Sequence, residues 1–329
     1  MKMKGKSVIV TGAGGFIGSH LTEALLNEGA EVTAFIHYNS RNNWGFLESY
    51  KENTPENLKI ILGDITDYES IRQAIRGKNL VFNLAALIGI PYSYIAPRSY
   101  IQTNTGGTLN VLQASLEEGV EKVIQTSTSE VYGTAQYVPI DEKHPLQGQS
   151  PYSASKIGAD KIAEAYFCSF GLNIATIRPF NTYGPRQSIR AVIPTIISQA
   201  LTSDSIHIGS LTPVRDFNYI SDTINGFIKI AESPDSGGKV INVGSGRGVT
   251  IEEVARIIIE QINPGASLIT DEKRTRPDNS EVRQLICDNQ LARNEIDWRP
   301  LVPLEEGIRH TIEWFRDPVN SVINHEYTM

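Results

Sequence analysis

The sequence predicts an α/β protein built on a doubly wound parallel sheet, followed by a smaller C-terminal α/β lobe. Short apolar runs alternate with segments of helical periodicity through the first 180 residues. Such alternation is typical of a parallel sheet covered by helices on both faces. After Pro179 the alternation loosens, with more Pro and Gly and shorter apolar runs, which indicates a second and smaller unit.

The first part of the chain contains six predicted strands and four predicted helices. The strands are short apolar runs at residues 7–11, 31–37, 58–62, 80–84, 122–126 and 173–177. The helices have apolar residues at helical spacing and lie at residues 16–28, 67–76, 100–118 and 151–170. In such a fold, ligands are expected at the carboxyl ends of the strands.

The second part contains shorter predicted elements. Strands are expected at residues 206–208, 215–219 and 240–243, and helices at 193–201, 221–232, 250–262 and 303–315. We expect residues 1–180 and 181–329 to form two domains. This boundary is left open, because part of the second segment could cross back to the large sheet.

Composition excludes several classes of function. The formal net charge is -7 and no long run of Lys or Arg occurs, so nucleic acid is not an expected partner. Cys168 and Cys287 lack the spacing of a metal site or a disulfide framework. No run approaches the roughly 20 apolar residues that span a bilayer. A soluble cytoplasmic protein without a metal is expected.

A glycine-rich turn follows the first strand and opens the first helix. The pattern GxGxxG fails, because Ile17 stands where its last glycine should be, but GxxGxxG fits with Gly12, Gly15 and Gly18. Backbone N–H groups in such a turn can approach a pyrophosphate. Together with Phe16 and Ile17 at the helix start, these glycines predict a dinucleotide site.

The end of the second strand leaves the choice between NAD and NADP open. An acidic side chain there binds the ribose 2'-OH of NAD, whereas cationic groups accept the 2'-phosphate of NADP. The segment 32–38 carries no acid, and Arg41 follows soon after. NADP is therefore as plausible as NAD.

A reaction centre is predicted around the fifth strand and the helix at 151–170. Tyr152 and Lys156 are four residues apart, so they share one helix face about 6 Å apart along the axis. A nearby ammonium favours the phenolate, so Lys156 is expected to lower the pKa of Tyr152 and make it a usable base. Thr128, Ser129 and Glu130 follow the fifth strand and should reach the same edge of the sheet.

The combination of GxxGxxG with YxxxK resembles the extended short-chain dehydrogenase/reductase superfamily, in the branch that acts on nucleotide sugars. The resemblance implies a Rossmann domain with tightly bound NAD or NADP that is recycled in each turnover. It implies that Asp64 and Ile65 lie at the adenine, and that Leu84, Ala85 and Ala86 lie beside the ribose. It also implies that Lys156, with Tyr152, contacts the nicotinamide ribose.

Glu130 separates possible activities within this resemblance. Epimerases of the branch generally have a small residue there, whereas a 4,6-dehydratase needs an additional acid/base group to remove the C5 proton and expel the C6 hydroxyl. The Thr-Ser-Glu triplet matches GDP-mannose dehydratases, and the serine leaves both proton steps to Glu130. The triplet also occurs in glucuronate decarboxylases, so a C4 epimerase and a decarboxylase remain alternatives. A non-catalytic dinucleotide-binding regulator is a more remote one.

The second half resembles the nucleotide-sugar lobe of the same branch. Bidentate arginines suit phosphate oxygens, and the resemblance implies substrate contacts from five residues: Asn181, Arg186, Arg190, Arg215 and Arg276. Segments 85–94, 132–140 and 183–188 are similar to the dehydratases of bacterial legionaminic acid pathways. That similarity implies GDP-N-acetylglucosamine as substrate and a 4-keto-6-deoxy product for surface nonulosonic acids. Helices 100–118 and 151–170 resemble the pair that forms the dimer contact in this superfamily, so a homodimer is expected.

Overall fold

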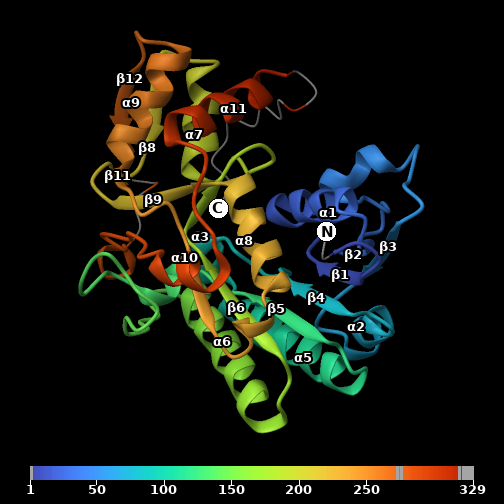
Figure 1. Cartoon of the computed structure of the whole chain (residues 1–329). Coiled ribbons are helices and arrows are strands. Elements are labelled where there is room, and N and C mark those ends of the chain that lie inside the picture. The colour runs from blue at the N-terminus through green and yellow to red at the C-terminus, as the bar shows by residue number, and fades with distance from the viewer. Residues whose placement is uncertain (1–2, 272–273, 275–276, 318–319, 321–329) are drawn as a thin grey trace.

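The computed structural model describes residues 3–271, 274, 277–317 and 320, and a seven-stranded sheet forms its centre (Figure 1). All neighbouring strands pair in parallel, in the order β10-β6-β5-β4-β1-β2-β3. The strands are β1 (Ser7–Thr11), β2 (Glu31–His37), β3 (Leu58–Gly63), β4 (Leu80–Asn83), β5 (Lys122–Thr126), β6 (Ile174–Pro179) and β10 (Val240–Val243).

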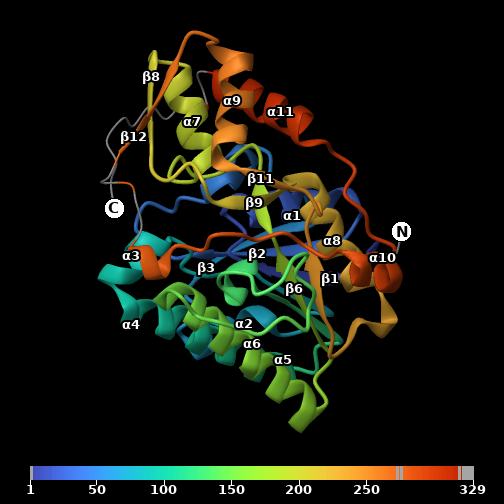
Figure 2. The same ribbon diagram turned by 90° about the vertical axis from the view of Figure 1, so that its left-hand side faces the viewer.

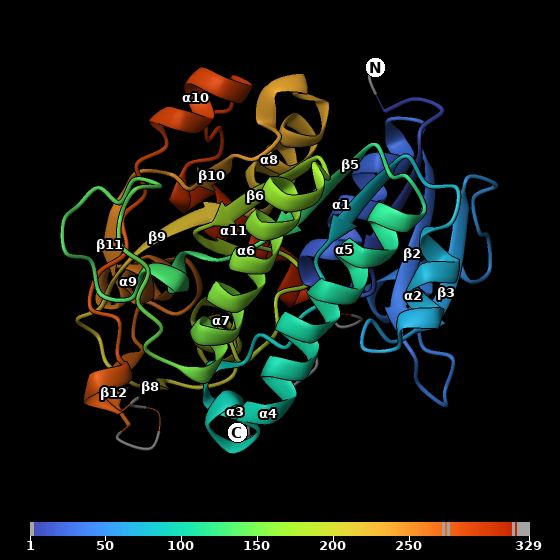
Figure 3. The ribbon, with the colours of Figure 1, turned by 90° about the horizontal axis from the view of Figure 1, so that it is seen from below.

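Helices cover both faces of this sheet. One face packs against α1 (Phe16–Asn27) and α8 (Ile220–Glu232), and the other against α2 (Tyr68–Ile75), α5 (Gly107–Glu117) and α6 (Pro151–Phe170), as Figures 1 and 3 show. Alternate residues of β1 supply the two cores: Val8 and Val10 join the first, and Ile9 joins the second. The doubly wound fold predicted from the sequence is therefore confirmed.

The segment that follows β6 builds two small sheets and the helices that pack on them, at the top of Figure 2. The sheets have the orders β11-β9-β7 and β12-β8. Their strands are β7 (Asn181–Tyr183), β8 (Ser205–Ile208), β9 (Val214–Tyr219), β11 (Gly248–Thr250) and β12 (Ser267–Thr270). The helices are α7 (Val192–Ala200), α9 (Ile251–Ile262) and α11 (Leu304–Arg316). Apolar side chains from these elements form a separate core.

Two elements of the later segment return to the large sheet. β10 pairs with β6 through the register Val240↔Thr176 to Val243↔Pro179, and α8 contributes Ile224 and Phe227 to the same core as Val8. α10 (Gln290–Ile296) follows near β10. The large sheet therefore contains chain from both halves of the sequence.

The helix expected at residues 100–118 is interrupted. The structure instead has α3 (Ile90–Ile95) and α4 (Pro97–Tyr100), a π-helical turn (Ile101–Gly106) and then α5. Short 3-10 turns lie at Gly45–Tyr50, Ser129–Tyr132, Pro234–Ser236 and Asp278–Ser280. Within the described ranges, no helix combines the length and apolar character needed to cross a membrane.

Candidate active site

The glycine turn between β1 and α1 is so tight that side chains at two of its glycines would clash with the backbone. Gly12 has a φ of +70°, and a Cβ there would lie 3.0 Å from the backbone that follows β4. A Cβ at Gly18 would lie 2.2 Å from the carbonyl oxygen of Gly12. Gly15 precedes α1 without a side-chain capping bond, so the first N–H groups of the helix, at Phe16 and Ile17, are available to an anion. The turn therefore fits a dinucleotide pyrophosphate.

A buried threonine fixes the segment that faces this turn. The Thr11 hydroxyl donates to Oδ1 of Asn83 at 2.8 Å and accepts the backbone N–H groups of Leu84 and Ala85 at 3.0 Å. Ala86 continues this half-buried segment. The structure thus brings residues 84–86 beside the glycine turn, where small side chains allow close approach of a ligand.

The ends of β2 and β3 form the edge expected to face the adenosine. Nδ1 of His37 lies 3.8 Å from Oδ2 of Asp64. Oδ1 of Asp64 accepts the backbone N–H of Thr66 at 2.8 Å, and Ile65 is buried. Arg41 is exposed. Asp64 and His37 therefore lie together at the carboxyl ends of β3 and β2, and β2 itself ends in a histidine and not an acid.

The N-terminus of α6 positions Tyr152 and Lys156. Ser150 and Ser153 form a reciprocal capping box around the first turn, which fixes where the helix begins. Tyr152 is 8% and Lys156 4% exposed. Nζ of Lys156 donates to the carbonyl oxygen of Thr126, at the end of β5, at 2.5 Å. The pair predicted from sequence spacing therefore lies buried at the carboxyl end of the sheet.

The loop after β5 brings a carboxylate to the same place. The hydroxyl of Thr128 hydrogen-bonds to the phenol of Tyr152 and accepts the backbone N–H of Glu130 at 3.2 Å. Ser129 is buried, and Glu130 is 9% exposed. The charge of Glu130 acts on Tyr152, so the structure brings the predicted triplet and the predicted tyrosine together.

The prediction that Lys156 lowers the pKa of Tyr152 is wrong. Burial raises the pKa of Tyr152, the Thr128 hydrogen bond opposes that shift, and the charge of Glu130 raises the pKa further. Burial also lowers the pKa of Lys156 to about 8, against the effect of Asp160. Desolvation is the largest cause of both shifts, because both groups are enclosed and burial disfavours their charged forms. Tyr152 therefore rests as a phenol.

Asn104, in the π-helical turn, was not predicted from the sequence. Its side-chain amide donates to the carbonyl of Leu87 at 2.9 Å and to Oγ of Ser155 at 2.9 Å, and it accepts the N–H of Leu87 at 2.8 Å. Nearby, the ring of Tyr100 packs edge-on against Tyr152 at 6.3 Å. A run of polar and glycine residues inside a predicted helix was the available signal.

The residues expected to contact the substrate differ in their burial and in their partners. Oδ1 of Asn181 is buried and has no hydrogen-bond partner among the described residues. Arg190 is exposed, and its charge acts on Tyr100, so it lies toward the reaction centre. Arg215 is 5% exposed and forms an ion pair with Glu281 at 3.2 Å. Asn181 and Arg190 are thus the better placed for a ligand.

Arg186 has a different partner from the one expected. Its guanidinium forms an ion pair with Glu23 at 2.8 Å and donates to Oγ of Ser19 at 3.2 Å, both on α1. The motif is therefore used to join the later segment to the first helix. Arg276 lies outside the described residues.

The chain matches a known protein family over most of its length. Residues 9–311 match the sequence profile of the family described as GDP-mannose 4,6 dehydratase. The chain belongs to the GDP-mannose 4,6 dehydratase family. Relatives of this family member include the UDP-glucose 4-epimerase of Mycolicibacterium smegmatis, which is 32% identical over 94% of this chain and 98% of the relative. The UDP-N-acetyl-alpha-D-glucosaminuronate decarboxylase of Bacillus cytotoxicus is also 32% identical, over 96% and 99%.

A solved structure is similar over nearly the whole length. DesIV of Streptomyces venezuelae, a dTDP-glucose 4,6-dehydratase solved with NAD bound, has a TM-score of 0.86 at 27% identity. The match covers 95% of this chain and 97% of DesIV. Membership of the GDP-mannose 4,6 dehydratase family therefore assigns the chain to the nucleotide-sugar dehydratases, epimerases and decarboxylases. The named relatives differ in reaction, so the side chains at the reaction centre must distinguish them.

Proposed function

We propose that this protein is an NAD(P)-dependent nucleotide-sugar 4,6-dehydratase that acts on GDP-N-acetylglucosamine. One observation carries the proposal: the buried Glu130 stands in a loop capped by Thr128, which hydrogen-bonds to Tyr152, and its charge acts on Tyr152. An epimerase has no step that needs this carboxylate, whereas removal of the C5 proton does. The tight glycine turn and the uncapped start of α1 support dinucleotide binding.

The residues divide the proton steps among them. The glycine turn and Lys156 would hold the NAD(P)+, which would supply reversible hydride transfer with C4 and C6, and its positive charge would favour the phenolate of Tyr152. Tyr152 accepts the C4 hydroxyl proton, with Thr128 holding its oxygen in place. The C4 ketone acidifies C5, and Glu130 takes the C5 proton and delivers it to the departing C6 hydroxyl. When the hydride returns to C6, C5 takes up a proton that balances the one Tyr152 removed from the C4 hydroxyl. One water leaves, and no net oxidation occurs. Lys156 contacts the nicotinamide ribose.

The proposed substrate and biological role rest on the resemblance of particular sequence segments. We propose that Asn181, Arg190, Arg215 and Arg276 hold the diphosphate and nucleoside, and that residues 181–329 chiefly form the nucleotide-sugar lobe. The GDP-N-acetylglucosamine assignment, and with it a role in bacterial nonulosonic acid synthesis, rests on segments 85–94, 132–140 and 183–188. A homodimer through α5 and α6 is part of the same proposal.

Product mass tests the proposed reaction. Purified protein is incubated with GDP-, UDP-, dTDP- and CDP-linked sugars, including GDP-N-acetylglucosamine. A 4,6-dehydratase releases a product lighter by one water, a decarboxylase one lighter by carbon dioxide, and an epimerase an isomer of unchanged mass. Consumption of added NAD(P)+ in proportion to product would exclude the internal hydride cycle.

A substitution tests the carboxylate. Glu130→Gln should abolish the lighter product while leaving NAD(P)H binding unchanged, because the amide cannot take the C5 proton. Glu164→Gln is the matched control, since this glutamate lies exposed on α6 and pairs with Lys161. Wild-type turnover by Glu130→Gln would refute the role given to Glu130.

A further inference from the structure

A buried ionic network lies directly behind the reaction centre. Oδ2 of Asp160 on α6 accepts the hydroxyl of Ser127 at 2.7 Å and pairs with Arg178 of β6 at 2.9 Å. Arg178 also donates to the phenol of Tyr132 at 2.9 Å, and Tyr132 donates to Oδ1 of Asn242 on β10 at 2.8 Å. Asp160 and Arg178 are 5% and 4% exposed. One carboxylate oxygen thus joins α6, β6 and the loop after β5.

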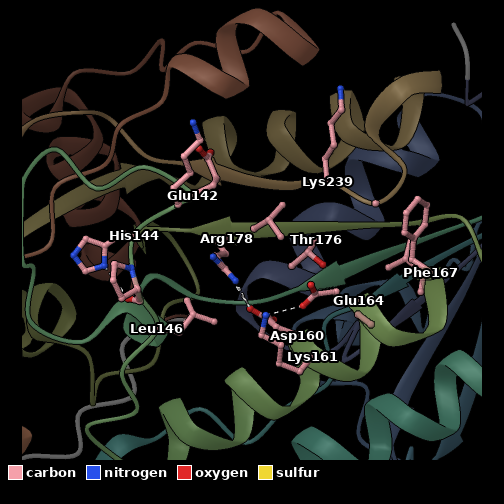
Figure 4. A pocket seen from close by; sticks show the side chains of 16 residues that line it. Glu142, His144, Leu146, Asp160, Lys161, Glu164, Phe167, Thr176, Arg178 and Lys239 are labelled. Atoms are coloured by element: carbon pink, nitrogen blue, oxygen red, sulfur yellow. Dashed lines mark hydrogen bonds and ion pairs between the residues drawn. The ribbon is translucent and has the colours of Figure 1, made fainter. Parts of the chain in front are cut away.

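Asp160 and Arg178 of this network line a cavity of about 380 Å³ between α6 and the strands β6 and β10 (Figure 4). Oδ1 of Asp160 is buried and has no hydrogen-bond partner among the described residues. A purely structural carboxylate normally has both oxygens bonded. Burial of an incompletely bonded carboxylate costs free energy, so the site needs an explanation other than packing.

The position of Asp160 supplies that explanation. It stands four residues after Lys156, so the two side chains share one face of α6. Its partner Ser127 immediately precedes Thr128, the residue that hydrogen-bonds to Tyr152. Asp160 is therefore connected to both halves of the reaction centre without belonging to it.

We propose that Asp160 is a positioning residue: it anchors the loop that carries Thr128 and Glu130 to α6, and it keeps Lys156 in the cationic form. This proposal rests on the proposed function only for its effect on turnover. Burial lowers the pKa of Lys156, and the Asp160 charge is the opposing influence. The same charge raises the pKa of Tyr152, so removing it should lower both pKa values.

The other groups near this pair do not duplicate the charge of Asp160. Glu142 accepts the N–H of Asn242, Lys161 pairs with Glu164, and Lys239 pairs with Glu295. The titratable and charged groups around Lys156 and Asp160 are Tyr100, Glu130, Tyr132, Glu142, Lys143, His144, Tyr152, Lys161, Glu164, Arg178 and Lys239. Besides burial, the influence on the pKa of Lys156 is the charge of Asp160.

The decisive experiment titrates Lys156 directly. Protein labelled with 13C at lysine Cε is followed by NMR from pH 6 to pH 10, and the Lys156 signal is assigned by its loss in Lys156→Met. The midpoint of the Lys156 titration in the wild-type protein is expected near pH 8. Asp160→Asn should lower it by about one pH unit, because an opposing charge nearby typically shifts a pKa by one unit or more. The pH profile of turnover should move to lower pH with it.

Two further variants separate the two roles of Asp160. Ser127→Ala removes the bond to the loop but keeps the charge, so turnover should fall while the Lys156 midpoint stays unchanged. Glu164→Gln removes a carboxylate one turn further along α6 and should change neither. Should Asp160→Asn fail to fold with Arg178 left unpaired, Asp160→Asn/Arg178→Met removes both charges. Because loss of the Arg178 cation alone favours the Lys156 ammonium, the reference for that variant is Arg178→Met, relative to which the Lys156 midpoint should fall.

Two results would overturn the proposal. One is an unchanged Lys156 midpoint in a folded variant that lacks the Asp160 carboxylate, and the other is an equal shift in Glu164→Gln. The midpoint is measured without substrate, so absence of turnover with every nucleotide sugar would refute the proposed function and leave this test intact.

Discussion

Replacing Gly18 by alanine should damage both the stability of the protein and its dinucleotide site. The new Cβ would lie 2.2 Å from the carbonyl oxygen of Gly12, where ordinary contact begins at 3.4 Å. The turn must therefore move by about 1.2 Å. Crowding of this kind lowers the free energy of unfolding by about 1–3 kcal/mol. The hydrogen bond from Gly15 N–H to that carbonyl, at 3.0 Å, contributes about 1 kcal/mol more.

These magnitudes set measurable expectations. A loss of about 2–4 kcal/mol should lower the Tm by about 3–6 °C in a chain of this size. Displacing the turn by about 1 Å should weaken NAD(P)H binding at least tenfold, because binding groups at a phosphate tolerate little misplacement. Thermal denaturation measures the first effect, and a fluorescence titration with NAD(P)H measures the second.

Gly106→Ala is the matched control. Gly106 has helical dihedral angles, and a Cβ there would lie 3.8 Å from its nearest neighbour, the carbonyl of Ile101. Alanine is favoured over glycine in a helix by about 0.5–1 kcal/mol, so the Tm should stay unchanged or rise. An unchanged Tm and cofactor affinity in Gly18→Ala would refute the steric reasoning.

Three other predictions concern residues away from the reaction centre. Asp216 accepts four hydrogen bonds of 2.6, 2.7, 2.8 and 3.1 Å, so Asp216→Asn should lower the free energy of unfolding by about 2–4 kcal/mol in urea titrations. Arg186→Ala should lower the free energy of unfolding by about 1 kcal/mol or less, since Arg186 pairs with Glu23. It should leave the KM for the nucleotide sugar within about twofold. A large rise in KM would show a substrate contact. Burial lowers the pKa of Lys122 to about 8, so the folded state binds fewer protons than the unfolded state between that pH and the ordinary lysine pKa. The stability of wild type relative to Lys122→Met should therefore rise with pH across this window, and a flat difference would contradict the shift.

Much of the large sheet was predictable because its strands are buried on both faces. β1, β2 and β5 have the predicted bounds, since each is a continuous run rich in β-branched residues. α6 also has its predicted bounds, because the Ser150 capping box opens it and Gly171, in the left-handed conformation, ends it. Strong local signals therefore coincide with the tertiary structure in this half.

Other features depend on contacts that a sequence does not display. β7 and β11 were not predicted, because strands of three residues are too short to show a periodicity. β12 was not predicted either, because it is mostly exposed and lacks the apolar run that marks a buried strand. The identities of Glu130, Tyr152 and Lys156 follow from spacing, but the direction of the Tyr152 pKa shift depends on burial. The pairing of Arg186 with Glu23 joins residues that are 163 positions apart, which no local pattern indicates.

The return of the chain to β10 has a consequence for synthesis on the ribosome. β6 is complete at Pro179, yet its outer neighbour is not made until Val243. Until then the nascent sheet has an open strand edge, and the core under α1 lacks Ile224 and Phe227 from α8. Exposed strand edges and apolar faces favour aggregation. A fragment ending near residue 180 should therefore be insoluble when expressed alone, and one ending after α8 and β10 should not.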